Sequence, residues 1–70
     1  MSTNQIADTT INTSAGEFRV STIQDVNANV FEVCTFRPGK SPIHEPIRVG
    51  TQDLAEEIHN AIVAVLAHCS

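Results

Sequence analysis

The sequence predicts an α+β fold: a three- or four-stranded antiparallel β-meander with one C-terminal amphipathic helix packed on one face of the sheet. Two runs rich in β-branched residues, 18–24 and 30–36, are followed by a short strand-like triplet at 47–49 (IRV). Residues 52–67 then repeat apolar side chains at helical spacing. Strands that precede a single helix in this order are typical of an antiparallel sheet with a helical cover.

A chain of 70 residues has room for one small domain, which we assign to residues 17–70. Residues 1–16 form an N-terminal arm that contains one charged residue, Asp8, and few large aliphatic side chains. Such a segment buries little apolar surface on its own. We therefore expect the arm to be partly flexible or to add an edge strand at Thr9–Thr13, with residues 14–17 as the turn into the domain.

The two β-rich runs predict a hairpin. Residues 18–24 (FRVSTIQ) nearly alternate, whereas residues 30–36 (VFEVCTF) are apolar on both faces, as is typical of an interior strand. The joining residues 25–29 contain Asp and Asn, which tolerate the backbone geometry of turns. Pro38 and Gly39 end the second strand, because proline has no N–H to donate.

A proline-containing loop over residues 38–46 leads to a short third strand, and Thr51 is the predicted N-cap of the helix. One arc of that helix is apolar: Leu54, Ala55, Ile58, Ala61, Ile62, Val65, Leu66 and Cys69. We expect this arc to pack on the inward-facing strand residues, which are Val20, Phe31, Val33, Ile47 and Val49.

Strand alternation sends a second set of side chains to the opposite face of the sheet. This set is the candidate interaction surface, and it comprises Arg19, Ile23, Val30, Glu32, Cys34, Phe36 and Arg48. A single helix cannot cover both faces, so either the arm folding across or a second copy in a symmetric homodimer should cover the remaining one. Its three charged residues are expected to pair across strands or to form a polar docking patch.

Charge and composition argue against several classes of function. The net charge is −4, and the basic residues are spread along the sequence, so we expect no nucleic-acid binding. The longest apolar run, residues 61–67, is too short to span a bilayer. Because the N-terminal residues also lack the features of a secretory signal, we expect an acidic, cytoplasmic protein without membrane contact. In that compartment Cys34 and Cys69 are expected to remain reduced.

Few residues could carry chemistry. The histidines and cysteines do not have the paired spacing of a zinc site, and the one close pair, His68 and Cys69, points in different directions on a helix. The segment 39–41 (GKS) is similar to the end of a phosphate-binding loop, but the preceding glycine and the following helix are missing. We therefore expect no catalytic residue, no metal and no cofactor.

One catalytic alternative stays open. Cys34 and His59 could form a thiolate–imidazole pair in a small-ligand-binding module or minimal enzyme, since a catalytic cysteine needs a neighbouring base. The structural interpretation is that Cys34 packs within its strand and that His59 is a half-buried imidazole bonded to a strand.

Three stretches together resemble a group of small uncharacterised proteins from bacteriophages and prophages: residues 16–23 (GEFRVSTI), residues 31–36 (FEVCTF), and residues 48–51 (RVGT) running on to Ala55 and His59. In that group a VSTV-like strand is followed by an FETMVF-like strand and then by a strand and helix reading RYxTxxEAxxGH. The present chain departs from this pattern at Val33, Cys34, Leu54 and Ile58.

The resemblance implies the same layout of strands and helix, and a phage-encoded accessory or host-interaction protein. It brings no assigned chemistry. Together with the exposed sheet face, it predicts a non-enzymatic protein that binds a host or phage protein, self-associates through the sheet as a homodimer, and lies in the host-cell cytoplasm.

Overall fold

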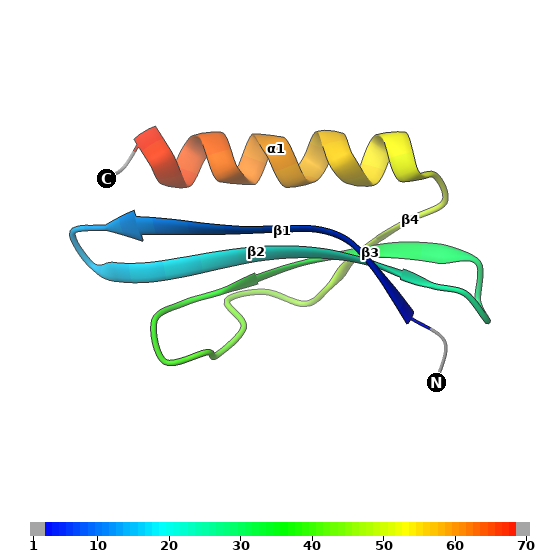
Figure 1. Ribbon diagram of the computed structural model, residues 1–70, viewed down its shortest axis with the longest axis horizontal. Coiled ribbons are helices and arrows are strands. Elements are labelled where there is room, and N and C mark those ends of the chain that lie inside the picture. Colours follow the sequence, from blue (N-terminus) through cyan, green and yellow to red (C-terminus); the bar gives the residue numbers. More distant parts are fainter. Residues whose placement is uncertain (1–2, 69–70) are drawn as a thin grey trace.

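The computed structural model describes residues 3–68 and contains one four-stranded antiparallel sheet with a helix along one face (Figure 1). The strands follow one another in the order β1-β2-β3-β4. The elements are β1 (Thr3–Thr13), β2 (Gly16–Asp25), β3 (Val30–Phe36), β4 (Ile47–Val49) and α1 (Gln52–His68). The predicted α+β meander with a C-terminal helix is therefore confirmed.

Strand β1 is longer than the sequence predicted, because it begins at Thr3 rather than at Thr9. It pairs with β2 along its length, with one irregularity between Gln5 and Ala7. Its inward side chains explain the extension: Ile11 belongs to the buried core, and Ile6 packs against that core. The arm thus continues the sheet at its edge and does not fold across the second face.

The turn between β1 and β2 is closed by hydrogen bonds of Thr13. Its hydroxyl accepts from the Ala15 N–H at 3.1 Å and donates to the Gly16 carbonyl at 2.9 Å. Gly16 has a φ of 121°, a conformation in which a side chain would be strained. Between β2 and β3 the Asp25 carboxylate accepts from the Ala28 N–H at 3.2 Å, as is usual for an aspartate that closes a turn.

The core lies between the sheet and α1. Its buried members are Ile11, Val20, Phe31, Val33 and Ala55, and the partly buried residues packed against them are Ile6, Ile47, Val49, Ile58, Ile62, Val63 and Leu66. The five strand residues predicted to face the helix all belong to this set. Thr51 caps the helix as predicted, because its hydroxyl accepts from the Leu54 N–H at 3.2 Å.

The helix is rotated relative to the predicted apolar arc. Leu54 and Val65 were expected inside but are 45% and 63% exposed, and Ala61 is exposed as well. His59 takes the central inward position, at 2% exposed. Hydrogen bonding is the cause, since a buried imidazole requires polar partners, and the sheet supplies them in β1 and β2. Cys69, the last member of the arc, lies outside the described residues.

Both ring nitrogens of His59 have partners on the sheet. The Nδ1 atom lies 2.8 Å from the Thr22 hydroxyl, and the Nε2 atom lies 2.9 Å from the Thr9 hydroxyl. A neutral imidazole has one donor and one acceptor nitrogen, and a threonine hydroxyl can complement either. His59 is therefore more deeply buried than the half-buried side chain predicted, and it is bonded to strand side chains as expected.

Stability should decline in mild acid because of His59. Burial lowers the pKa of its imidazole below the ordinary value of about 6.5, and the negative charges of Asp8 and Glu56 oppose that shift only in part. The folded state then binds a proton less readily than the unfolded state, so stability is complete above about pH 6.5 and falls as the pH drops toward the folded-state pKa.

Urea unfolding at a series of pH values measures this effect. The free energy of unfolding of the wild type should fall from pH 7 to pH 5, whereas a His59→Gln variant should be nearly flat over that interval. If the free energy of unfolding changed with pH equally in both proteins, His59 would not be the group responsible.

Three glycines allow steric strain to be separated from backbone strain. A Cβ atom built on Gly16 would lie 2.7 Å from the Pro38 Cγ atom, and Gly16 also has a positive φ. Gly39 has a φ of 94° but open space around it, and Gly50 has neither constraint.

Alanine should therefore lower the free energy of unfolding most at Gly16, less at Gly39 and least at Gly50. We expect Gly50→Ala to change it by less than about 0.5 kcal/mol, Gly39→Ala to lower it by about 1 kcal/mol, and Gly16→Ala to lower it by at least about 2 kcal/mol. Equal losses at Gly16 and Gly39 would show that Pro38 yields without cost.

Candidate functional site

The face of the sheet opposite α1 carries the surface predicted from the sequence. Ile23, Val30, Cys34 and Phe36 are only partly buried there, and we call these four residues the open-face patch. They alternate along their strands with residues of the other face; in β3, for example, the intervening Val33 and Thr35 are fully buried. Within residues 3–68 no second helix or sheet lies over this face, as Figure 1 shows.

The loop between β3 and β4, residues 37–46, borders this patch. It continues along the edge of β3 beyond the short β4, with a bridge between Phe36 and Pro42 and a 3.0 Å hydrogen bond from the Ile43 N–H to the Thr35 carbonyl. It lines a depression together with Cys34 and Phe36. The covers expected from the sequence were the arm and a second chain, so this loop is an unpredicted neighbour of the patch.

Two ion pairs flank the patch. Glu32 and Arg48 lie opposite each other in the β3–β4 register, and the Arg48 Nε donates to Glu32 at 2.8 Å, which is the cross-strand pairing that was one of the two alternatives expected from the sequence. Arg19 instead bonds Asp8 of β1 through two nitrogens, at 2.7 and 2.6 Å. These hydrogen bonds lower the pKa of the Asp8 carboxyl. Asp8 was missed as a site residue because its partner depends on the β1–β2 register.

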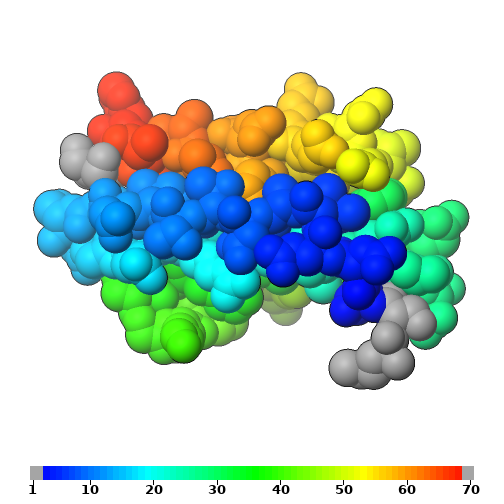
Figure 2. Space-filling view, viewed as in Figure 1, coloured from blue at the N-terminus to red at the C-terminus, as the bar shows by residue number. Residues whose placement is uncertain are grey.

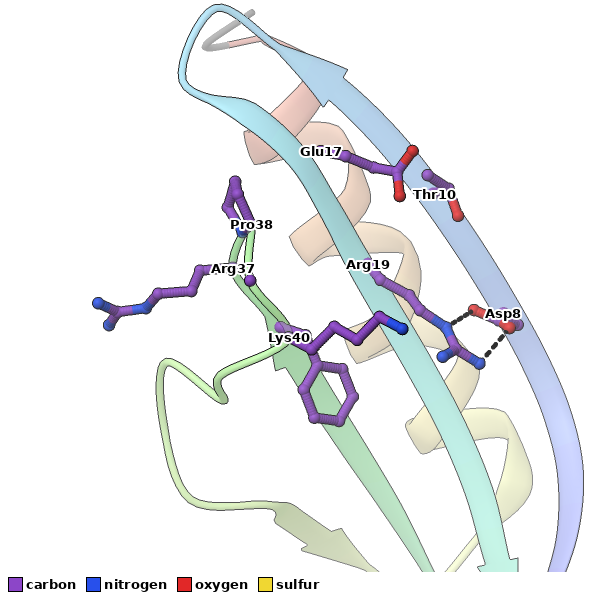
Figure 3. A pocket seen from close by; sticks show the side chains of 9 residues that line it. Asp8, Thr10, Glu17, Arg19, Arg37, Pro38 and Lys40 are labelled. Carbon is purple, nitrogen blue, oxygen red and sulfur yellow. Dashed lines mark hydrogen bonds and ion pairs between the residues drawn. The ribbon is translucent and has the colours of Figure 1, made fainter.

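One end of the open face forms a depression of about 750 Å³ (Figure 3). Arg19, Arg37 and Lys40 all line it, so three of the four basic residues are close together even though they are spread along the sequence. Asp8 and Glu17 lie on the same walls and nearly balance that charge. Figure 3 shows the Lys40 side chain reaching toward Arg19 while Arg37 points away.

Cys34 and His59 are not brought together. Cys34 lies on the open face of β3, opposite Ser21 of β2. His59 lies on the other side of the sheet, bonded to Thr9 and Thr22. The sheet therefore separates the thiol from the imidazole, and the thiolate–imidazole pair considered from the sequence does not form. Burial, together with the negative charge of Glu32, raises the pKa of the Cys34 thiol, which stays protonated at neutral pH.

His44 holds the loop against β3. Its Nδ1–H donates to the Glu45 carbonyl at 2.7 Å, because a carbonyl can only accept. In the neutral ring the Nε2 atom then accepts from the Thr35 hydroxyl, 2.9 Å away. This histidine thus has two structural partners. Among residues 3–68 no three His, Cys, Asp or Glu side chains gather closely enough to hold a metal ion.

A separate apolar groove runs beside the helix, on the β4 side of the sheet. It has a volume of about 390 Å³, and its walls are Thr35, Ile43, His44, Ile47, Ala61, Ile62, Val65 and Leu66. The rotation of α1 explains it, since Ala61 and Val65 are turned toward this space and away from the core. No helix in the described part of the chain has the length and apolar character needed to cross a membrane.

Searches of protein-family models, of curated proteins and of solved structures give no match to this chain.

Cys34 should react slowly with iodoacetamide in the folded protein at neutral pH. Its thiol is partly covered and its pKa is raised, so little thiolate is available to attack. Labelling followed by mass spectrometry should show modification of Cys34 many-fold slower than in urea-unfolded protein. A folded-state rate equal to that of a free thiol would favour a reactive cysteine over a packing residue.

Proposed function

We propose that this chain is a small non-enzymatic interaction protein, encoded by a phage or prophage, that binds a protein partner through the open face of its sheet and self-associates through the sheet. The observation that carries the proposal is the open-face patch of Ile23, Val30, Cys34 and Phe36, which α1, the one helix within residues 3–68, leaves uncovered. Apolar side chains grouped on a sheet are typical of surfaces that bury against another protein.

The distribution of charge around the patch supports a protein as the ligand. Arg48 is neutralised by Glu32, and Arg19 by Asp8, so the patch is flanked by balanced ion pairs. An apolar centre with a polar rim is the usual composition of a protein–protein interface. A highly charged ligand such as nucleic acid would instead favour a surface of one sign.

The catalytic alternative has lost its geometric support. It requires the Cys34 thiol and the His59 imidazole to act on one ligand, and these groups lie on opposite sides of the sheet. A small-ligand module would have to use the apolar groove beside α1, where the walls present mainly aliphatic groups.

The proposal is tested by replacing one apolar residue on each side of the molecule with lysine. Ile23→Lys places a charge in the open-face patch, whereas Val65→Lys places the same charge on the exposed side of α1 as a matched control. Circular dichroism should show that both variants are folded. A protein captured from a bacterial lysate by the tagged wild type, and then purified, serves as the partner for binding measurements.

The partner should bind the Val65→Lys variant as it binds the wild type, and the Ile23→Lys variant at least about tenfold more weakly, a difference of roughly 1.4 kcal/mol. Equal binding by both variants, or a loss confined to Val65→Lys, would move the interface away from the open face.

A further inference from the structure

Strand β1 lies at one edge of the sheet, and no described strand pairs with its outer side. We propose that β1 pairs in antiparallel fashion with β1 of a second copy of this chain, which joins two four-stranded sheets into one of eight strands. This rests on the self-association in the proposed function but assigns it to the edge of the sheet, so that the open face stays free for a partner.

The edge of β1 has unpaired backbone groups directed outward. Thr13 and Gly16 pair directly on either side of a two-residue turn, and antiparallel pairs alternate between bonded and non-bonded positions. Asp8, Thr10 and Asn12 are therefore at the positions whose N–H and C=O groups point away from β2. Figure 2 shows β1, in blue, uncovered along the face of the molecule below α1.

Strand β1 lacks most of the features that prevent edge-to-edge pairing in other proteins. Those features are short strands, lysine or proline on the edge, and bulges. The strand has eleven residues, with no lysine, arginine or proline among them. Its irregularity between Gln5 and Ala7 affects only the N-terminal part, which leaves Ala7–Thr13 as a regular stretch of seven residues.

The opposite edge of the sheet is protected. Strand β4 has only three residues and follows directly after Pro46. Beyond β4 the outer edge of β3 is covered by the 37–46 loop, in which Pro42 forms a bridge with Phe36 and the Ile43 N–H donates to the Thr35 carbonyl. Because one edge is short and covered while the other is long and open, β1 is the edge that can add a strand.

Charge favours a second copy over an acidic or basic peptide. The chain has a net charge of −4, which opposes self-association, but Asp8 is the single charged residue of β1 and Arg19 of the same chain neutralises it. The other outward positions carry Thr10 and Asn12. Neutral Thr and Asn side chains pair favourably with each other across strands, so the edge is complementary to itself.

An antiparallel pair of identical strands has its two-fold axis perpendicular to the sheet. Both helices then lie on one face of the dimer, and both open faces lie side by side on the other. Dimerisation in this way doubles the open-face patch instead of covering it. One pair of strands buries less area than a standard interface, so we expect a dimer with a dissociation constant in the micromolar range.

Sedimentation velocity of the full chain through the micromolar concentration range tests the proposed pairing of β1 with β1 of a second copy. Thr10→Pro removes an outward N–H from the middle of the regular stretch, and proline is tolerated on a strand edge that faces solvent. Thr10→Val is the matched control, because it keeps the N–H. We expect the wild type, Thr10→Val and the open-face variant Ile23→Lys to dimerise, and Thr10→Pro to dimerise at least about tenfold more weakly.

Amide hydrogen exchange of the unmodified chain gives a second readout if Thr10→Pro fails to fold. The amides of Asp8, Thr10 and Asn12 should become protected as the concentration rises. A wild type that stays monomeric, or amides that stay unprotected, would overturn the proposal. So would a dimer lost in Ile23→Lys but kept in Thr10→Pro, which would indicate face-to-face association. If Ile23→Lys loses partner binding but keeps the dimer, the partner binds the open face and the dimer forms through another surface, so the result supports the proposed function without deciding the β1 pairing, which the Thr10 variants test.

Discussion

The hydrogen bonds that hold His59 between β1 and β2 are the interaction on which the rest of the structure depends. Hydrophobic contact alone is non-directional, so a smooth apolar arc would let α1 turn about its axis at little cost. The hydroxyls of Thr9 and Thr22 remove that freedom, because a buried imidazole that lost them would leave polar groups unsatisfied. The rotation of the helix is thereby fixed, and part of its apolar arc, including Val65, is left exposed.

The same contact explains why a polar arm becomes a long strand. Strand β1 contributes Ile6 and Ile11 to the core, which is little apolar surface for eleven residues. The bond from Thr9 to the helix adds a specific link between the first and last elements of the chain. The helix covers only one face of the sheet, so the open-face patch stays uncovered, while the apolar groove lies along the flank of α1 itself.

Local patterns in the sequence were sufficient for most of the fold. The strands β2 and β3 and the helix follow from alternation and helical spacing, and alternation alone assigned Val20 and Val33 to the core and Ile23 and Cys34 to the other face. The N-cap at Thr51 was also recognisable, because capping depends on residues close in sequence.

The features that were missed depend on contacts between distant residues. The start of β1 and the ion pair of Asp8 with Arg19 follow from the register of the first hairpin, which no local pattern specifies. The rotation of α1 was missed because His59 was expected to be only half-buried, whereas its two partners place it at the centre of the inward face. The separation of Cys34 from His59 could have been deduced, since alternation already directed Cys34 away from the helix.

The first hairpin and the 37–46 loop are in contact through Gly16 and Pro38, two residues far apart in the chain. The side-chain volumes at positions 16 and 38 are therefore not independent during evolution. A relative that carries a larger residue at position 16 should carry a smaller one at position 38, and paired substitutions of this kind would trace the contact through an alignment.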